Sequence, residues 1–204
     1  MILGITGSIA SGKSTVSAMF EARGAALVSA DQLARDAVRP GSATLALLVD
    51  RFGAEILEAS GRLDRARLGA MIFADPAARQ DLNRIIHPAI AALAEEQLAR
   101  LRRSGAPLVV YEAPLLFEAG ANGRVDRVLV VKVDPEIQLQ RLMRRDGLDA
   151  EAARQRIASQ MSQAEKLARA DFVIDNSGSR NVTEIQVAAL WARLAATPAS
   201  RRKS

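Results

Sequence analysis

The sequence predicts an α/β fold built on a mostly parallel, five-stranded sheet. Short runs of β-branched residues alternate with longer amphipathic helical patterns along the 204 residues. The strand candidates are nearly continuous in apolar residues, as expected for strands that helices cover on both faces. A glycine-rich turn also joins the first strand candidate to the first helical pattern. Together these observations indicate three layers, helix–sheet–helix, in a chain long enough for one domain with insertions.

Five segments have the strand pattern, and helix signals lie between them. The strand candidates are Ile2–Thr6, Ala26–Ser29, Leu108–Tyr111, Val128–Val133 and Phe172–Ile174. One helix is predicted to start at Ser42 and stop at Gly53, and a second to start at Asp64 and run to Phe73. Pro88 is predicted to begin a helix over Ala89–Arg103, and Asp134-Pro135 to begin another. Two further starts have the capping-box spacing, Ser162–Glu165 and Asn181–Glu184.

Two stretches exceed what a minimal alternating sheet requires. About 78 residues between the second and third strand candidates show helical patterns only, far more than one crossover helix needs. Asp134–Arg169, between the fourth and fifth candidates, is also helical and rich in arginine. The chain is therefore predicted to be a single domain with two helical excursions.

The segment from Gly7 to Ser14 reads GSIASGKS and matches the phosphate-loop pattern G-x-x-x-x-G-K-[ST] in full. Glycines let successive backbone N–H groups face a phosphate, and the following helix adds its positive end. Lys13 would reach the β- and γ-phosphate oxygens, and the Ser14 hydroxyl would bind Mg²⁺. The sequence thus predicts a nucleoside-triphosphate site that binds Mg²⁺.

The class of phosphate-loop protein follows from the other motifs. No Asn-Lys-x-Asp is present to read guanine. The nearest counterpart to the Asp-Glu strand end of a mechanical ATPase is Val109–Glu112, which continues into Ala113-Pro114 instead. A carboxylate, Asp31, follows the second strand candidate instead, and arginines gather late in the chain. A small-molecule kinase needs a carboxylate for the acceptor hydroxyl and arginines that close over the phosphates.

Composition excludes several other classes. The chain has no cysteine, which excludes disulfide scaffolds and thiol nucleophiles. Of the net charge of +5, three charges lie in Arg201-Arg202-Lys203, leaving 25 basic against 23 acidic residues. With only 3% aromatic residues and scattered cations, nucleic-acid binding is not expected. No apolar stretch is long enough to span a bilayer and no signal peptide is evident, so a cytoplasmic protein is expected.

The ordered motifs resemble the dephospho-coenzyme A kinase family over about residues 1–180. The matching segments are Gly4–Thr15, Ala30-Asp31, Ala34-Arg35, Leu63-Asp64-Arg65, His87-Pro88, Pro114–Glu118, Arg141, Arg145, Arg156–Gln160, Lys166 and Asp175–Gly178. Two residues depart from the family pattern: Ser29, where the family usually has Asp, and Glu112, where an Asp is common. The resemblance implies phosphorylation of the ribose 3′-hydroxyl of dephospho-coenzyme A by ATP, the last step of coenzyme A biosynthesis.

The resemblance also implies an organisation and a set of site residues. The core would be about residues 1–59, 106–135 and 161–196, the coenzyme A-binding insertion about 60–105 and the lid about 136–160. Independently of the resemblance, the basic residues at its end predict that 197–204 is a disordered tail. The catalytic residues would be Asp31, Lys13 and Arg141. The ATP contacts would be Ser8, Ile9, Ala10, Ser11, Gly12, Lys13, Ser14, Thr15, Arg145 and Asn176, and the substrate contacts Asp31, Arg35, His87, Pro114 and Glu118.

Plain structural roles stay open for several of these residues. Asp31 could instead cap a helix over Gln32–Val38, and His87 could be a turn residue before a proline. Arg141 and Arg145 lie on one helix face and could be solvated, as is expected of Arg144.

Two other functions stay open as well. One is a phosphate-loop kinase that acts on a nucleoside or a nucleotide. The other is a nucleotide switch or a nucleic-acid-associated protein that uses ATP only to change conformation.

Overall fold

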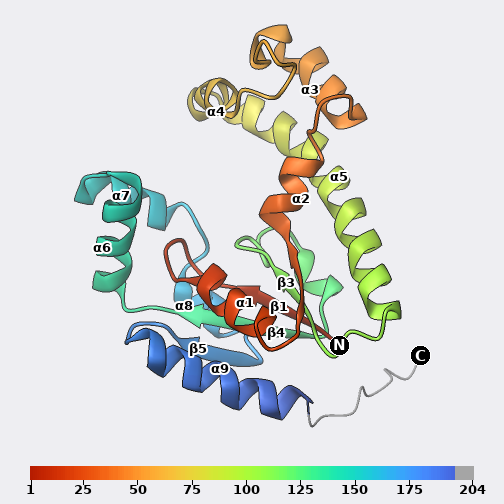
Figure 1. The fold of residues 1–204 in the computed structure, drawn as a ribbon. Helices are drawn as coiled ribbons and strands as arrows, with labels where there is room; N and C mark the ends of the chain where they lie inside the picture. Colours follow the sequence, from red (N-terminus) through yellow and green to blue (C-terminus); the bar gives the residue numbers. More distant parts are fainter. Residues whose placement is uncertain (196–204) are drawn as a thin grey trace. The chain divides into compact units, whose positions relative to one another are not determined.

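The computed structural model describes residues 1–195 and contains one five-stranded sheet. The strand order is β2-β3-β1-β4-β5, and β1 pairs in parallel with β3 and β4, as β4 does with β5. The strands are β1 (Ile2–Thr6), β2 (Ala26–Ser29), β3 (Val109–Glu112), β4 (Arg127–Lys132) and β5 (Phe172–Asp175), shown in Figure 1. The predicted sheet is confirmed, with each strand within one residue of its expected bounds.

The central strand β1 is buried along its whole length, which explains its nearly continuous apolar sequence. Its alternate residues Leu3 and Ile5 belong to a core that includes Phe20 of α1 (Lys13–Glu21) and Leu190 of α9 (Arg180–Ala195). Because β1 lies between β3 and β4, the chain leaves it at a point where the strand order reverses. Ligands of open α/β sheets bind at such a point, beyond the carboxyl ends of the strands.

The described chain separates into two compact units, and the sheet lies in the first. This unit comprises residues 1–28 and 98–195 of the described chain. Its remaining helices are η2 (Ala121–Arg124), α6 (Pro135–Asp146), α7 (Ala150–Ala158) and α8 (Gln163–Leu167). Ser162 and Glu165 form the predicted capping box at the start of α8. The predicted disordered tail lies outside the described residues.

The second unit, Ser29–Gln97, is helical and has a core of its own. Its elements are α2 (Ala30–Asp36), α3 (Ala43–Phe52), η1 (Ala54–Ile56), α4 (Arg65–Ala74) and most of α5 (Pro76–Arg103). Ser42 and Asp64 cap α3 and α4, as predicted. The predicted insertion, about residues 60–105, overlaps this unit, and its role in acceptor binding stays a prediction.

Two predicted helix starts are wrong. Pro88 does not begin a helix but lies inside α5, which starts at Pro76. The Asp75 carboxylate accepts hydrogen bonds from the N–H groups of Ala77 and Ala78 at 2.8 and 3.2 Å, so the cap lies before Pro76. Apolar residues on both sides of Pro88 are packed, among them Ile86 and Ala94, and this packing offsets the hydrogen bond that a proline removes.

The helix α9 likewise begins at Arg180, before the predicted cap at Asn181. The Val182 N–H donates to the Ser179 hydroxyl at 3.5 Å, and the Thr183 N–H donates to the Ser179 carbonyl at 3.2 Å. Ser179 therefore satisfies the first free N–H groups, and the Asn181–Glu184 spacing is not a capping box.

Candidate active site

The phosphate loop runs from the carboxyl end of β1 to the first turn of α1. The Ser11 N–H donates to the Ser8 carbonyl at 3.2 Å, which closes the turn. Gly7 has no room for a side chain, because a Cβ there would lie 2.5 Å from the Val131 carbonyl oxygen. Gly12 caps α1 in the left-handed region, with φ of 87°. Gly7 and Gly12 therefore allow the tight backbone turn that phosphate-binding loops use.

Lys13 is folded over this loop and is only 8% exposed. Its ammonium group donates to the carbonyls of Gly7 and Ser8 at 3.0 Å each. These bonds hold a nearly buried positive charge beside the positive end of α1. Such a site favours an anion, because the charge of Lys13 adds to the positive end of the helix.

Ser14 is joined to the neighbouring strand through Glu112. Its hydroxyl donates to Glu112 Oε1 at 2.8 Å, across a sequence separation of 98 residues. Glu112 ends β3, where its backbone pairs in register with Ile5 of β1. A hydroxyl and a carboxylate are hard oxygen ligands that suit Mg²⁺. Glu112 was not among the predicted metal-binding residues, although its position beside the carboxyl end of a strand candidate was the available signal.

The end of β5 supports the loop from the other side. Asn176 is 7% exposed; its Nδ2 donates to the Ser11 carbonyl at 2.8 Å, and its Oδ1 accepts from Thr183 at 2.8 Å. The preceding Asp175 accepts from Lys132, whose hydrogen bond is the main reason that the pKa of this carboxyl is lowered to about 2. Asn176 is thus placed against the phosphate loop, and its expected contact with ATP stays a prediction.

The contact between Gly12 and Asn176 leads to a stability prediction. An alanine at position 12 would be strained at φ of 87°, and its Cβ would collide with Nδ2 of Asn176. We expect Gly12→Ala to cost about 1–2 kcal/mol for the left-handed backbone and about 1 kcal/mol more for the Asn176–Ser11 hydrogen bond. Urea denaturation measures the loss, and the KM for ATP should rise in parallel.

Gly24 provides the matched control for this substitution. It has a similar φ of 99°, but a Cβ there would meet nothing within 4 Å. Gly24→Ala should therefore lose only the conformational part and keep its KM for ATP. Equal losses at the two positions would mean that the Asn176 contact contributes nothing.

Two glutamine side chains hold the backbone of a single loop residue, Ile9. The Ile9 N–H donates to Gln160 Oε1 at 2.9 Å, and Gln138 Nε2 donates to the Ile9 carbonyl at 2.8 Å. Gln138 belongs to α6 and Gln160 follows α7. The segment that the sequence predicted as a lid is therefore bonded directly to the phosphate loop.

The arginines of α6 differ in their partners. Arg145 binds Asp146 through two hydrogen bonds of 2.7 and 3.0 Å, and Arg156 donates to the same carboxylate at 2.8 Å. Arg141 is half-buried and forms no ion pair or side-chain hydrogen bond with the described residues, whereas Arg144 is exposed. Arg144 likewise has no such partner among the described residues, so Arg141 and Arg144 keep their forks available to a ligand, whereas that of Arg145 is bound to Asp146.

Pro114 and Glu118, expected at the acceptor pocket, both bind a lysine. The Pro114 carbonyl accepts from Thr6 at 3.1 Å and from Lys166 at 2.9 Å. Glu118 pairs with the same fully buried Lys166 at 2.8 Å and accepts from the Met161 N–H at 3.2 Å. These contacts join the segment after β3 to α8. A contact of either residue with substrate stays a prediction.

The second unit holds the other predicted site residues. Ser29 is the N-cap of α2, since its hydroxyl accepts from the Gln32 N–H at 3.3 Å. The open alternative that Asp31 is the cap is therefore wrong: Asp31 lies exposed in the first turn, with its carboxylate available. His87 is exposed in the middle of α5, and Arg35 is exposed on α2.

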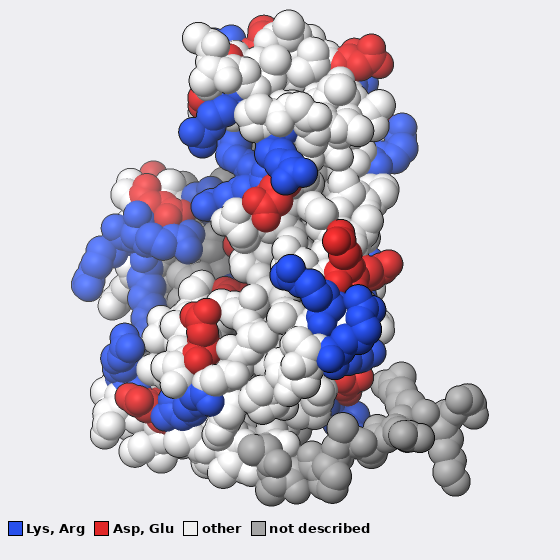
Figure 2. Space-filling view, turned by 45° about the vertical axis from the view of Figure 1, so that its right-hand side comes forward, with Lys and Arg blue, Asp and Glu red and all other residues white. Residues whose placement is uncertain are grey.

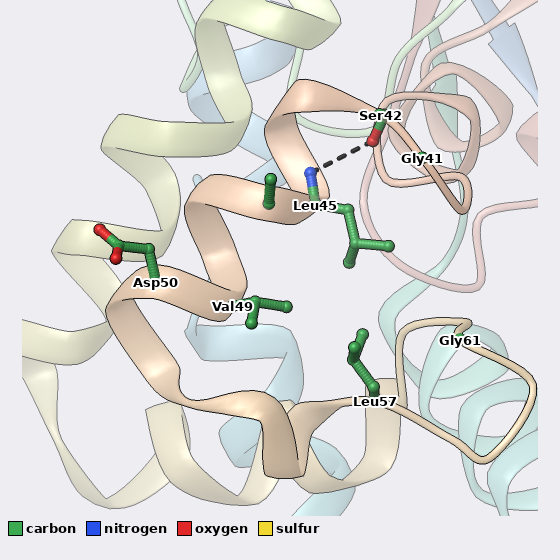
Figure 3. Close-up of a pocket in the computed structure, with 8 residues that line it drawn as sticks. Gly41, Ser42, Leu45, Val49, Asp50, Leu57 and Gly61 are labelled. Carbon is green, nitrogen blue, oxygen red and sulfur yellow. Dashed lines mark hydrogen bonds between the residues drawn. The ribbon is translucent and has the colours of Figure 1, made fainter.

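Two hollows are formed within the second unit. One, of about 470 Å³, is lined by Arg35 and three further arginines. The other, of about 480 Å³, is mainly apolar; Figure 3 shows Leu45, Val49 and Leu57 pointing into it and Asp50 pointing away. The segments 39–42 and 57–65 contribute to both hollows.

On the face shown in Figure 2, basic side chains form several groups, with acidic side chains among them. Within residues 1–195, no helix combines the length and apolar character that a membrane-spanning segment requires.

The phosphate loop leaves the central strand of the sheet and ends in Lys13 and Ser14. These features define a phosphate-loop protein with a kinase-type fold. A family model described as dephospho-CoA kinase matches residues 1–181. The chain belongs to the dephospho-CoA kinase family, and the resemblance seen in the sequence is confirmed. Members of this family are phosphotransferases.

Individual relatives agree with this assignment. The chain is 61% identical to a dephospho-CoA kinase of Syntrophotalea carbinolica, over 95% of this chain and 92% of the relative. It is 53% identical to one of Geobacter sulfurreducens, over 94% and 98%. A solved dephospho-CoA kinase from Campylobacter jejuni superimposes with a TM-score of 0.75 at 32% identity, covering 95% of this chain and 96% of that one.

Proposed function

We propose that the protein transfers the terminal phosphoryl group of ATP to the ribose 3′-hydroxyl of dephospho-coenzyme A, which gives coenzyme A and ADP in the cytoplasm. The observation that carries the proposal is the complete phosphate loop, with Lys13 over it and Ser14 bonded to Glu112, in a chain of this family.

On the donor side, the loop N–H groups and Lys13 bind the β- and γ-phosphate oxygens and hold the leaving oxygen in place. Ser14 and Glu112 would hold Mg²⁺, whose charge offsets that of the phosphates when it is bound. Phosphoryl transfer requires little covalent chemistry from the protein, so positioning and electrostatic stabilisation supply most of the rate.

On the acceptor side, Asp31 orients the 3′-hydroxyl and accepts its proton as the new P–O bond forms and the bond to ADP breaks. Its exposed position in the first turn of α2 leaves the carboxylate open to a substrate. Arg141 would pair with the transferring phosphoryl group, since its guanidinium has no partner among the described residues.

Arg141→Ala should lower kcat by about 10²-fold or more, the scale of one lost electrostatic donor at a transition state. Arg144→Ala is the matched control, because Arg144 is exposed on the same helix and carries the same charge. Steady-state kinetics of both variants measures the difference. Equal losses would mean that α6 acts through its total charge and not through Arg141.

An ADP-release assay over a panel of acceptors tests the proposed function. The panel is dephospho-coenzyme A, adenosine and nucleoside monophosphates, and turnover should depend on the first. Turnover with a nucleoside or nucleotide instead would make the protein a different small-molecule kinase. ATP binding without turnover on any acceptor would overturn the proposal in favour of a nucleotide switch.

A further inference from the structure

Four arginines surround one hollow of the second unit. They come from two segments that lie apart in the sequence, and they are Arg35, Arg39, Arg62 and Arg65. The hollow has a volume of about 470 Å³ and is completed by Val38, Pro40 and Leu63. Val38 and Leu63 are buried, whereas all four arginines are exposed to solvent. We name this feature the arginine hollow.

The positive charges of the arginine hollow have no counter-charge in the described chain. None of the four guanidinium groups forms an ion pair or a side-chain hydrogen bond with residues 1–195. Other arginines of the unit are paired, such as Arg51 with Asp81 at 2.7 Å. The nearest carboxylates in the sequence are engaged elsewhere: Asp36 accepts from Gln32, and Asp64 caps α4.

Four like charges around a concave surface repel one another, and the repulsion is relieved when an anion binds. Guanidinium forks match the paired oxygens of a phosphate and bind them through two parallel hydrogen bonds. A hollow that offers several such forks is suited to a group with more than one phosphate. Val38 and Leu63 are apolar, so the arginines provide the hydrogen bonds to those oxygens.

We infer that the arginine hollow binds the diphosphate of the acceptor nucleotide, an inference that rests on the proposed function. Arg35 lies four residues after Asp31 on α2, so the two side chains share one helix face, about 6 Å apart along the axis. In dephospho-coenzyme A, the 5′-diphosphate is attached to the ribose that carries the 3′-hydroxyl. A diphosphate held beside Arg35 therefore places this ribose within reach of Asp31.

The test compares Arg62→Gln and Arg65→Gln in acceptor kinetics. We expect the KM for dephospho-coenzyme A to rise roughly 10-fold or more in each, the scale of one lost hydrogen bond to a charged group. The KM for ATP should not change, which separates this hollow from the phosphate loop. Arg62→Lys should recover only part of the affinity, because it keeps the charge but not the fork.

Arg79→Gln is the matched control. Arg79 is an exposed arginine of α5 in the same unit and lies outside the hollow, so its loss changes the net charge equally. It should leave the KM for the acceptor unchanged. A rise equal to that of Arg62→Gln would overturn the inference, since it would show a general charge effect, as would an unchanged KM in both hollow variants.

Calorimetry with dephospho-coenzyme A and the nucleotide-free protein separates the two proposals. If the natural chain turns over this acceptor but the hollow variants bind it equally well, the inference fails and the proposed function stands. If the natural chain binds it without turnover and the hollow variants lose binding, the proposed function fails and the hollow stands. Unchanged melting temperatures confirm that the variants are folded.

Discussion

Lys13→Ala should lower kcat by about 10³-fold or more, at the upper end of the effect of one lost electrostatic donor. The ammonium group is only 8% exposed and lies over the phosphate loop, where it has two carbonyl partners. Its charge is therefore positioned for the β- and γ-phosphates before any nucleotide binds, and alanine supplies nothing in its place. Turnover of ATP with dephospho-coenzyme A, beside circular dichroism of the variant, measures the effect.

Lys132→Ala is the control for a lost lysine in the same unit. Lys132 is half-buried at the end of β4 and pairs with Asp175 at 2.9 Å, and it forms no hydrogen bond to the carbonyls of Gly7 and Ser8. This variant should keep most of its kcat. A near-normal kcat in Lys13→Ala, with an intact fold, would rule out the phosphate loop as the donor site.

Asp31→Asn should lower kcat by about 10²–10⁴-fold, the usual range for a lost general base. The substitution keeps the shape of the side chain and removes the charge that would draw the proton from the 3′-hydroxyl. Because Ser29 is the N-cap of α2, the melting temperature should change little. The charge in the first turn contributes only about 0.3–1 kcal/mol through the helix dipole.

Two variants on α2 serve as controls for this result, one for activity and one for stability. Asp36→Asn removes a carboxylate that accepts from Gln32 at the other end of α2 and should leave kcat nearly unchanged. Ser29→Ala removes the cap and should lower stability by about 1 kcal/mol. If Asp31→Asn lowers the melting temperature as Ser29→Ala does, with kcat within a few-fold of normal, then the base lies elsewhere.

The sequence predicted those parts of the fold and site that depend on neighbouring residues. The phosphate loop is a contiguous motif, so Lys13 and Ser14 could be assigned from spacing alone. The strands could be placed because burial on both faces leaves long apolar runs. The boundary of α2 was harder, since Ser29 and Asp31 are both good caps two residues apart and only the backbone geometry distinguishes them.

The parts that could not be predicted depend on contacts between distant segments. Glu112 meets Ser14 across 98 residues, and Gln160 meets Ile9 across 151. No local pattern marks a glutamine as a partner of one loop residue. The α5 helix shows the opposite case. A proline inside a helix is unfavourable, yet packing along the helix keeps Pro88 in its interior.

The double attachment of Ile9 makes the phosphate loop and the arginine-bearing helix α6 a thermodynamically linked pair. Moving α6 and the end of α7 away from the loop would break both bonds of Ile9 or would carry its peptide groups along. By reciprocity, whatever free energy a nucleotide gains from the loop in this conformation also favours this position of α6, and the reverse holds equally. A nucleotide that prefers this conformation of the loop would therefore also favour this position of Arg141.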